Sequence, residues 1–339
     1  MGVKPIVSVV MSVWNGEKYI RESIESILDQ TFSDFEFIII NDGSTDHTPK
    51  ILAEYEQKDN RVRVFNQSNQ GLTVSLNNAI QHAKGKYIAR MDSGDISMPT
   101  RVEKQLKYLT QNEQTGIVGS HFSYIDDNGK ITETVNRPIE SGFLKWLLLF
   151  YNPIPNSLAM YRLNLAREIG GYNLHYSYSQ DYDFLCSISE RSNITIVPEV
   201  LFLVRLTQSE DISSKHSSKQ KELSIQTSQI MMAKLIKSRP PWEIVRNLKY
   251  EIIPSIEEAG KCSKLIIALY QSFLTQNILE HKEKAMIKKD SARRLWNISR
   301  PNLKYFSMWL VLLYSCYLDS YYAKSLLVAP IRWGKLKLT

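Results

Sequence analysis

Hydrophobic residues in the first ninety positions fall into two alternating patterns. Four runs are apolar and rich in β-branched residues, as strands covered on both faces are: 5–13, 35–40, 61–65 and 87–91. Three segments between them repeat apolar residues at the three- and four-residue steps of an amphipathic helix: 17–29, 44–55 and 71–83. This alternation predicts an α/β fold with a mostly parallel central sheet, right-handed crossovers and flanking helices.

Candidate binding residues lie at the C-terminal ends of three of these runs. They are Ser12, Trp14 and Asn15 at the end of the first, Asp42 at the end of the second, and Asp92, Ser93 and Asp95 at the end of the fourth. The carboxyl ends of parallel strands meet at one edge of a sheet, where open α/β folds bind ligands. There an aromatic ring can stack on a base, and a carboxylate can accept from base or ribose. A Mg²⁺ or Mn²⁺ ion held by oxygen ligands can bridge phosphates.

The run 88–95, taken alone, also fits a strand that ends in a solvated turn. The chain contains neither a Gly-x-Gly-x-x-Gly fingerprint after its first strand nor a P-loop, which disfavours a dinucleotide enzyme or a P-loop NTPase. Phosphate would therefore be handled by a cation rather than by a glycine-rich loop.

Five motifs in order resemble family 2 glycosyltransferases, the large inverting group of bacterial sugar transferases: 7–16, 26–32, 41–46, 92–99 and 170–183. The resemblance covers roughly residues 5–207. It implies a GT-A, Rossmann-like fold and an enzyme that moves a sugar from a nucleoside-diphosphate sugar to an acceptor hydroxyl. UDP is the favoured nucleotide, with dTDP and GDP left open. The implied acceptor is a glycan or a lipid-linked glycan in bacterial surface polysaccharide synthesis.

The resemblance also implies roles for individual residues. Those implied at the nucleotide are Ser12, Trp14, Asn15, Asp42, Asp92 and Ser93. Asp92 begins the metal and diphosphate motif, and Asp181 matches the catalytic base. Residues implied on the acceptor or diphosphate side are Asn156, Gln180 and Arg205, although Arg205 also fits a surface cation. Asp183 is expected only to complement the dipole of the helix that it begins.

The chain departs from the family at Gly94, where relatives commonly carry a second carboxylate that binds the metal directly. We favour a Mn²⁺ or Mg²⁺ site through Asp92 or Asp95. Catalysis without a tightly bound metal, a weakened site and an engineered substitution are the alternatives. A catalytically weakened relative that binds sugar nucleotides is therefore the alternative function.

The predicted catalytic domain spans residues 1–212, with a nucleotide-binding half over about 1–115 and an acceptor half over 116–212. In the acceptor half we expect a strand at 116–120, an Asn-Gly hairpin at 125–131, a chain reversal at 170–172 after a short helix, and a helix opening at Gln180. The segment 152–160 resembles the part of the family that lines the acceptor pocket.

Residues 213–339 form a predicted basic helical extension. Residues 215–339 hold 22 Lys and Arg against 9 Asp and Glu, whereas residues 1–214 hold 20 against 26. Helices are predicted at 223–237, at 242–253 and as one long run over 264–297, and 213–219 is expected to be a linker or lid. This charge favours an anionic partner. Nucleic acid is not expected, because no aromatic residues interleave the cations and no DNA-reading motif is present.

The apolar segment 303–318 has 16 residues, fewer than the roughly 20 that span a bilayer. Its Tyr and Trp residues, with Arg332, Lys335 and Lys337 beyond, suit a helix lying on an anionic membrane surface. A buried helix or a homodimer seam is the alternative. With no secretory signal and three widely spaced cysteines, the expected location is cytoplasmic, peripheral on the inner face of the plasma membrane.

Overall fold

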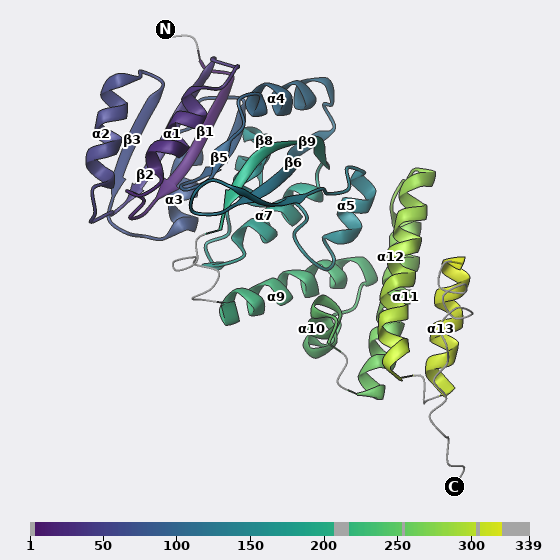
Figure 1. Cartoon of the computed structure of the whole chain (residues 1–339). Helices are drawn as coiled ribbons and strands as arrows, with labels where there is room; N and C mark the ends of the chain where they lie inside the picture. The colour runs from purple at the N-terminus through teal and green to yellow at the C-terminus, as the bar shows by residue number, and fades with distance from the viewer. Residues whose placement is uncertain (1–3, 207–216, 253–254, 303–305, 321–339) are drawn as a thin grey trace. The chain divides into compact units, whose positions relative to one another are not determined.

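The computed structural model describes residues 4–206, 217–252, 255–302 and 306–320 (Figure 1). It separates into two compact units, Met1–Thr227 and Ser228–Thr339. The predicted division of the chain at 212/213 stays a prediction. Of the predicted linker 213–219, residues 213–216 lie outside the described residues, and 217–219 belong to a helix.

The first unit begins with strands and helices in strict alternation, as predicted. Its elements are β1 (Val7–Val13), α1 (Ile20–Leu28), β2 (Phe35–Asp42), α2 (Thr48–Lys58), β3 (Val62–Gln67), α3 (Leu72–His82) and β4 (Tyr87–Asp92). The apolar residues of β1 and β2 are buried along their whole length, because helices cover the sheet on both sides. The strand order β3-β2-β1-β4 is parallel throughout.

The order of these strands places a topological switch point at the end of β1. The chain moves from β1 to β2 and β3 on one side, then crosses back to β4 on the other side of β1. With right-handed crossovers, this reversal places α3 on the face opposite α1 and α2. The loops after β1 and β4 therefore diverge, and ligands of open α/β sheets bind between such loops.

The second half of the sheet is mixed. Its elements are β5 (Ile96–Ser97), α4 (Arg101–Gln111), β6 (Thr115–Ile125), β7 (Ile131–Val135), α5 (Ser141–Leu147), η1 (Asn156–Leu158), β8 (Met160–Arg162), α6 (Leu163–Glu168), α7 (Gln180–Ser189) and β9 (Asn193–Arg205). Strand β8 runs antiparallel to both β4 and β6, whereas β6 and β9 are parallel. The Asn-Gly hairpin is confirmed, with Gly129 at φ 79°. The sequence had not indicated β8 or the long β9, which contains Pro198.

The described helices of the basic extension are α9 (Ser217–Ile236), α10 (Trp242–Tyr250), α11 (Ile256–Gln276), α12 (His281–Ser299) and α13 (Phe306–Leu318), with the short η2 (Arg300–Asn302) before α13. The single run predicted over 264–297 is wrong. The chain breaks after Gln276, and Glu280 starts a new helix through reciprocal side-chain and backbone bonds with Glu283. Among the described residues, no helix is both long and apolar enough to cross a membrane.

Candidate active site

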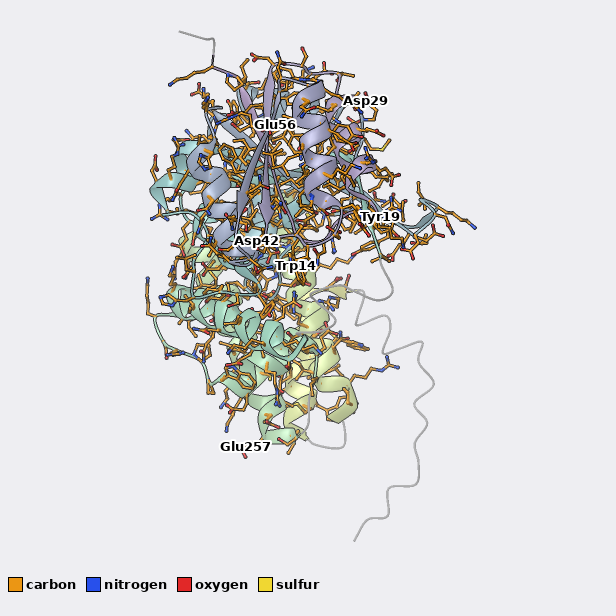
Figure 2. All side chains as sticks on the ribbon, turned by 90° about the vertical axis from the view of Figure 1, so that its left-hand side faces the viewer. Trp14, Tyr19, Asp29, Asp42, Glu56 and Glu257 are labelled. Atoms are coloured by element: carbon orange, nitrogen blue, oxygen red, sulfur yellow. The ribbon has the colours of Figure 1, made fainter. Side chains whose placement is uncertain are left out.

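The ends of β1, β2 and β4 bring the predicted nucleotide residues to one edge of the sheet. Ser12 lies in register with Asp92 on β4, and Val13 with Asn41 on β2. Trp14 follows β1, and its side chain is 59% exposed, as a platform for a base must be. Figure 2 shows Trp14 and Asp42 at the same end of the strands.

The loops after β1 and β2 are tied together by side chains. Asn15 has φ 51°, its N–H donates to Ser44 Oγ (3.0 Å), and its Oδ1 accepts from Thr45 N (2.8 Å). Asp46 accepts from Glu17 N (3.0 Å) and from Thr48 N (2.9 Å). These bonds hold the loop after β1 against the loop after β2, and α1 begins at Ile20, three residues after the predicted Glu17.

Asp42 ends β2 and is 3% exposed. Its carboxylate accepts from Gln67 Nε2 (2.8 Å), Gln70 N (2.8 Å) and Gly71 N (2.9 Å). The buried charge is thus stabilised by three N–H donors, two of them from the loop before α3. In this structure Asp42 fixes that loop, and direct recognition of a base by its carboxylate stays a prediction.

Asp92 ends β4 with a side chain that is 43% exposed. One carboxylate oxygen pairs with the guanidinium of Arg90, which is completely buried two residues earlier in the same strand. Arg101 on α4, also buried, donates to the backbone carbonyl of Arg90 over 2.6 Å. Neither arginine was among the predicted site residues. The signal for Arg90 was available, because a charged residue inside an apolar strand requires a partner.

Asp95 lies three residues further on and is 6% exposed. Its Oδ1 accepts from Arg205 N (3.0 Å), and the Ser157 hydroxyl also bonds its side chain. Burial, with the nearby charge of Asp92, raises the pKa of Asp95 to about 8. A carboxyl held in this way is enclosed by its partners, and its burial favours the protonated form.

The guanidinium of Arg205 is occupied by protein groups. It donates to the carbonyls of Gly94 (2.9 Å), Asp126 (3.0 Å) and Asp127 (3.3 Å), and it pairs with Glu22 on α1. Arg205 therefore joins β9 to the loop after β4 and to the β6–β7 hairpin, rather than lying on the surface. A contact of Arg205 with a diphosphate stays a prediction.

Gly94 lies at the centre of the metal motif with φ 102°, and an added Cβ would have no atom within 4 Å. The position therefore opens onto free space, but its backbone conformation disfavours an L side chain. Among the described residues no group of three His, Cys, Asp or Glu could hold a metal ion. The donor set fits a cation held by few protein oxygens, with Asp92 as the carboxylate that is open to it.

Asp181 lies in the first turn of α7, where it contacts the segment 152–160 that was predicted to line the acceptor pocket. Asn152 Nδ2 donates to Asp181 Oδ2 over 2.8 Å, and the hydroxyl of Tyr172 donates to Asn156 Oδ1 over 3.0 Å. Burial raises the pKa of Asp181, and the negative charge of Asp92 adds to the rise. Gln180 is buried, and Ser93 is partly exposed beside Asp92.

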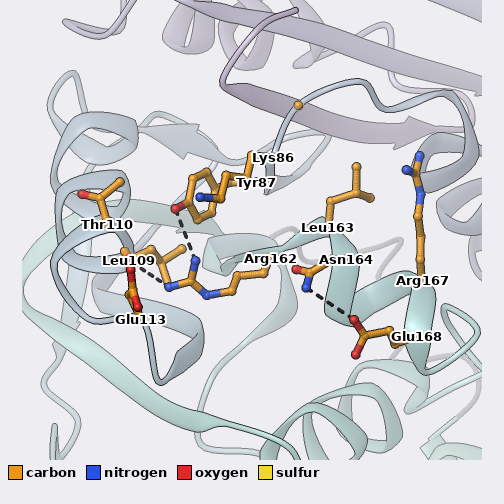
Figure 3. Close-up of a pocket in the computed structure, with 11 residues that line it drawn as sticks. Lys86, Tyr87, Leu109, Thr110, Glu113, Arg162, Leu163, Asn164, Arg167 and Glu168 are labelled. Atoms are coloured by element: carbon orange, nitrogen blue, oxygen red, sulfur yellow. Dashed lines mark hydrogen bonds between the residues drawn. The ribbon is translucent and has the colours of Figure 1, made fainter.

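A groove of about 780 Å³ lies at the opposite edge of the sheet, where β4 begins and β8 ends (Figure 3). The guanidinium of Arg162 in its wall donates to the carbonyls of Leu109 (2.7 Å) and Asn112 (3.1 Å), and Arg167 donates to that of Ala83 (2.9 Å). These cations stabilise backbone carbonyls. The groove contains none of the predicted site residues.

Comparison with known proteins identifies the family. Residues 8–170 match the model described as glycosyl transferase family 2. An uncharacterized glycosyltransferase of Haemophilus influenzae is 36% identical over 228 residues, which cover 64% of this chain and 70% of the relative. The chain belongs to glycosyltransferase family 2. Another member, the O-antigen biosynthesis glycosyltransferase WbnJ of Escherichia coli, is 37% identical over 191 residues, 56% of this chain and 74% of WbnJ.

Solved structures confirm the predicted GT-A fold of this family 2 enzyme. The crystal structure of S. aureus TarS 1-349 in complex with UDP-GlcNAc has a TM-score of 0.58 at 16% identity, covering 94% of this chain and 92% of the TarS 1-349 chain. The mannosyltransferase PcManGT from Pyrobaculum calidifontis, in complex with GDP-Man and Mn²⁺, has a TM-score of 0.51 at 17% identity, covering 96% of this chain and 88% of the PcManGT chain. At these identities the likeness shows the fold alone.

Proposed function

We propose that this enzyme is an inverting glycosyltransferase whose donor binds at the end of β1, β2 and β4 and whose general base is Asp181. The observation that carries the proposal is that one segment, 152–157, bonds Asp181 through Asn152 and Asp95, beside the end of β4, through Ser157, since a base must lie near the diphosphate of the donor. Trp14 offers an exposed ring for the base, and Ser12 and Asn15 border the same edge. UDP is favoured because TarS was solved with UDP-GlcNAc.

The proposed reaction is a single displacement at the anomeric carbon. An acceptor hydroxyl oxygen forms the new bond to C1 as the bond from C1 to the diphosphate oxygen breaks. The nucleoside diphosphate leaves with that electron pair, and Asp181 takes the hydroxyl proton. Attack from the face opposite the leaving group inverts C1, so no carboxylate nucleophile is needed.

Asp92 is the residue that we assign to a divalent cation. One of its oxygens pairs with Arg90, and the side chain is partly exposed, whereas Asp95 is enclosed by Arg205 and Ser157. Mg²⁺ and Mn²⁺ are often bound through one or two carboxylates together with substrate phosphates. When bound, the cation supplies charge stabilisation to the leaving diphosphate. Ligation by Asp95, which the sequence also indicated, is the weaker assignment.

The test of the proposed function separates binding from chemistry. A panel of UDP-, dTDP- and GDP-sugars, screened by thermal shift with and without Mn²⁺, selects the donor. With that donor, Asp181→Asn should keep the thermal shift and lose about 10³-fold in nucleoside-diphosphate release. Equal release by mutant and parent would refute the base assignment. Absence of any release from the parent would favour the weakened, binding-only relative that Gly94 suggests.

Because the pKa of Asp181 is raised, the acid limb of the kcat/KM profile should lie at a higher pH than the ordinary pKa of an aspartate would give. The base acts only when it is deprotonated, so kcat/KM should fall as the pH drops through this elevated pKa. The rate profile of the parent between pH 4 and 8 measures it. A profile that is flat across this range would contradict the assignment.

The acceptor is proposed from relatives and from the extension. WbnJ is named for O-antigen biosynthesis, which favours a glycan or lipid-linked glycan. On α13, Leu310, Leu313 and Tyr317 are more than half exposed on one face, and the ammonium of Lys288 lies 5.8 Å from the Tyr317 ring centroid. An apolar face beside cations suits an anionic membrane surface.

Flotation with phosphatidylglycerol vesicles tests this contact. The parent should rise with the vesicles at low salt, and Leu310→Ser/Leu313→Ser should stay at the bottom of the gradient. A parent that stays at the bottom and is dimeric by light scattering would instead assign the face to a second copy of the chain.

A further inference from the structure

Asn152 contacts the proposed base from a segment that lies 29 residues earlier in the chain. Its Nδ2 donates to Asp181 Oδ2 over 2.8 Å, and its Oδ1 accepts from Ile154 N over 3.0 Å. A carboxylate only accepts and a backbone N–H only donates, so both contacts require the same orientation of the amide. The side chain thus has one arrangement that satisfies both partners.

The segment that carries Asn152 is anchored in the protein core. Ile154 is 2% exposed, and its Cγ2 would lie 2.8 Å from a Cβ on Gly119 of β6, so the segment packs directly against the strand backbone. Pro153 favours an extended conformation of Asn152. The resulting turn holds the amide towards α7.

The start of α7 is anchored as well. The hydroxyl of Tyr182, next to Asp181, donates to the carbonyl of Leu148 over 2.5 Å. The backbone N–H groups of Asp181 and Tyr182 also bond the Asp181 carboxylate. The Asn152 amide is therefore the single side-chain donor among the hydrogen bonds described for this carboxylate.

We propose that Asn152 is a positioning residue for sugar transfer, which orients the carboxylate of Asp181 and favours its charged form. This inference rests on the proposed base role of Asp181. Two influences oppose the charge: burial and, to a smaller extent, the carboxylate of Asp92. The amide hydrogen bond acts against them, because an N–H donor stabilises the ionised carboxylate more strongly than the neutral acid.

The test is Asn152→Asp, which keeps an oxygen for Ile154 N but replaces the donor with a second carboxylate. With the donor sugar that the thermal-shift panel selects, its kcat should fall about tenfold or more near neutral pH. The acid limb of kcat/KM should move up by about one pH unit or more, because two adjacent carboxylates share a proton. The KM for the donor should stay within about twofold of the parent.

Asn173→Asp is the matched control. Asn173 Oδ1 also accepts from a backbone N–H two residues on, that of His175 (3.1 Å), but the residue is exposed and makes no described contact with Asp181. Its profile should match that of the parent. Asn152→Ser is the second variant, because its hydroxyl can accept from Ile154 N but is too short to reach Asp181. Asn152→Ser should also move the acid limb of kcat/KM to a higher pH, although it adds no charge.

The outcomes separate this inference from the proposed function. A raised acid limb in both Asn152 variants, with a parental profile in Asn173→Asp, supports the positioning role. Asn152 profiles that superimpose on that of the parent overturn it, even where the rate falls. If Asp181→Asn still releases nucleoside diphosphate at the parental rate, the base assignment itself fails. If that variant is inactive while the Asn152 profiles are unchanged, only the positioning inference fails.

Discussion

In the nucleotide half, Asp42 and Asp46 accept hydrogen bonds from backbone N–H groups of loops that follow parallel strands. In the acceptor half, Asp181 depends instead on an amide side chain whose segment packs against Gly119. The first arrangement follows from the chain connectivity, since the loops after β1, β2 and β3 all emerge at one edge. The second requires the segment 152–158 to pack between the backbone of β6 and the start of α7. Backbone connectivity therefore organises one half, and side-chain packing organises the other.

The largest expected effect comes from removing the buried carboxylate of the nucleotide half. Asp42→Ala leaves the N–H groups of Gln67, Gln70 and Gly71 without their acceptor. The free energy of unfolding should fall by about 3 kcal/mol, measured by urea denaturation. The exposed Asp34→Ala should change it by less than about 0.5 kcal/mol. Equal losses in the two variants would contradict the role of Asp42 in holding the loop.

Gly119→Val should disturb the acceptor half selectively. A Cβ at this position would lie 2.8 Å from Ile154 and 3.1 Å from Leu158, so the 152–158 segment must shift. We expect a loss of about 2 kcal/mol in stability and a larger loss in turnover than in nucleotide affinity. Gly260→Val on α11, where an added Cβ meets no atom within 4 Å, controls for the loss of a glycine. A parental turnover in Gly119→Val would show that packing here does not position Asp181.

The buried Asp95 predicts a pH dependence of stability in metal-free buffer. Its folded pKa of about 8 exceeds the ordinary value of 3.8, so the folded state binds the proton more tightly than the unfolded state. The associated stability is present at low pH and is lost as the pH rises towards 8 and above. Asp95→Asn should remove this loss and gain roughly 1 kcal/mol relative to the parent for each pH unit between pH 5 and pH 7. A difference in Tm between variant and parent that is the same at both pH values would argue against a raised pKa of Asp95.

The smallest effect is expected at Gly94, where the two substitutions Gly94→Ala and Gly94→Asp differ only in a carboxylate. Both should cost about 1 kcal/mol, because φ is 102° although space is open. If Asp92 alone holds the cation, Gly94→Asp should bind Mn²⁺ more tightly than Gly94→Ala in a titration with nucleoside diphosphate present. Equal affinities would indicate that the cation site does not include this turn.

The elements that could be predicted from the sequence are those whose pattern is local. The strands β1, β2 and β4 are continuous apolar runs, and the hairpin after β6 has its Asn-Gly turn. Strand β8 has three residues and β9 contains a proline, so neither has a clear period. The break between α11 and α12 was missed because apolar residues such as Ile278 and Leu279 continue the helical pattern.

The sequence by itself determined the family, the alternation of strands and helices in the nucleotide half, and the edge to which Asp42 and Asp92 belong, because these depend on residues close together in the chain. Only the tertiary structure decided the states of the carboxylates. Asp95 is enclosed by Arg205, Asp92 is paired with Arg90, and Asp181 is held by Asn152. Burial and hydrogen bonding depend on residues that are distant in sequence, and together they determine whether a carboxyl group is ionised.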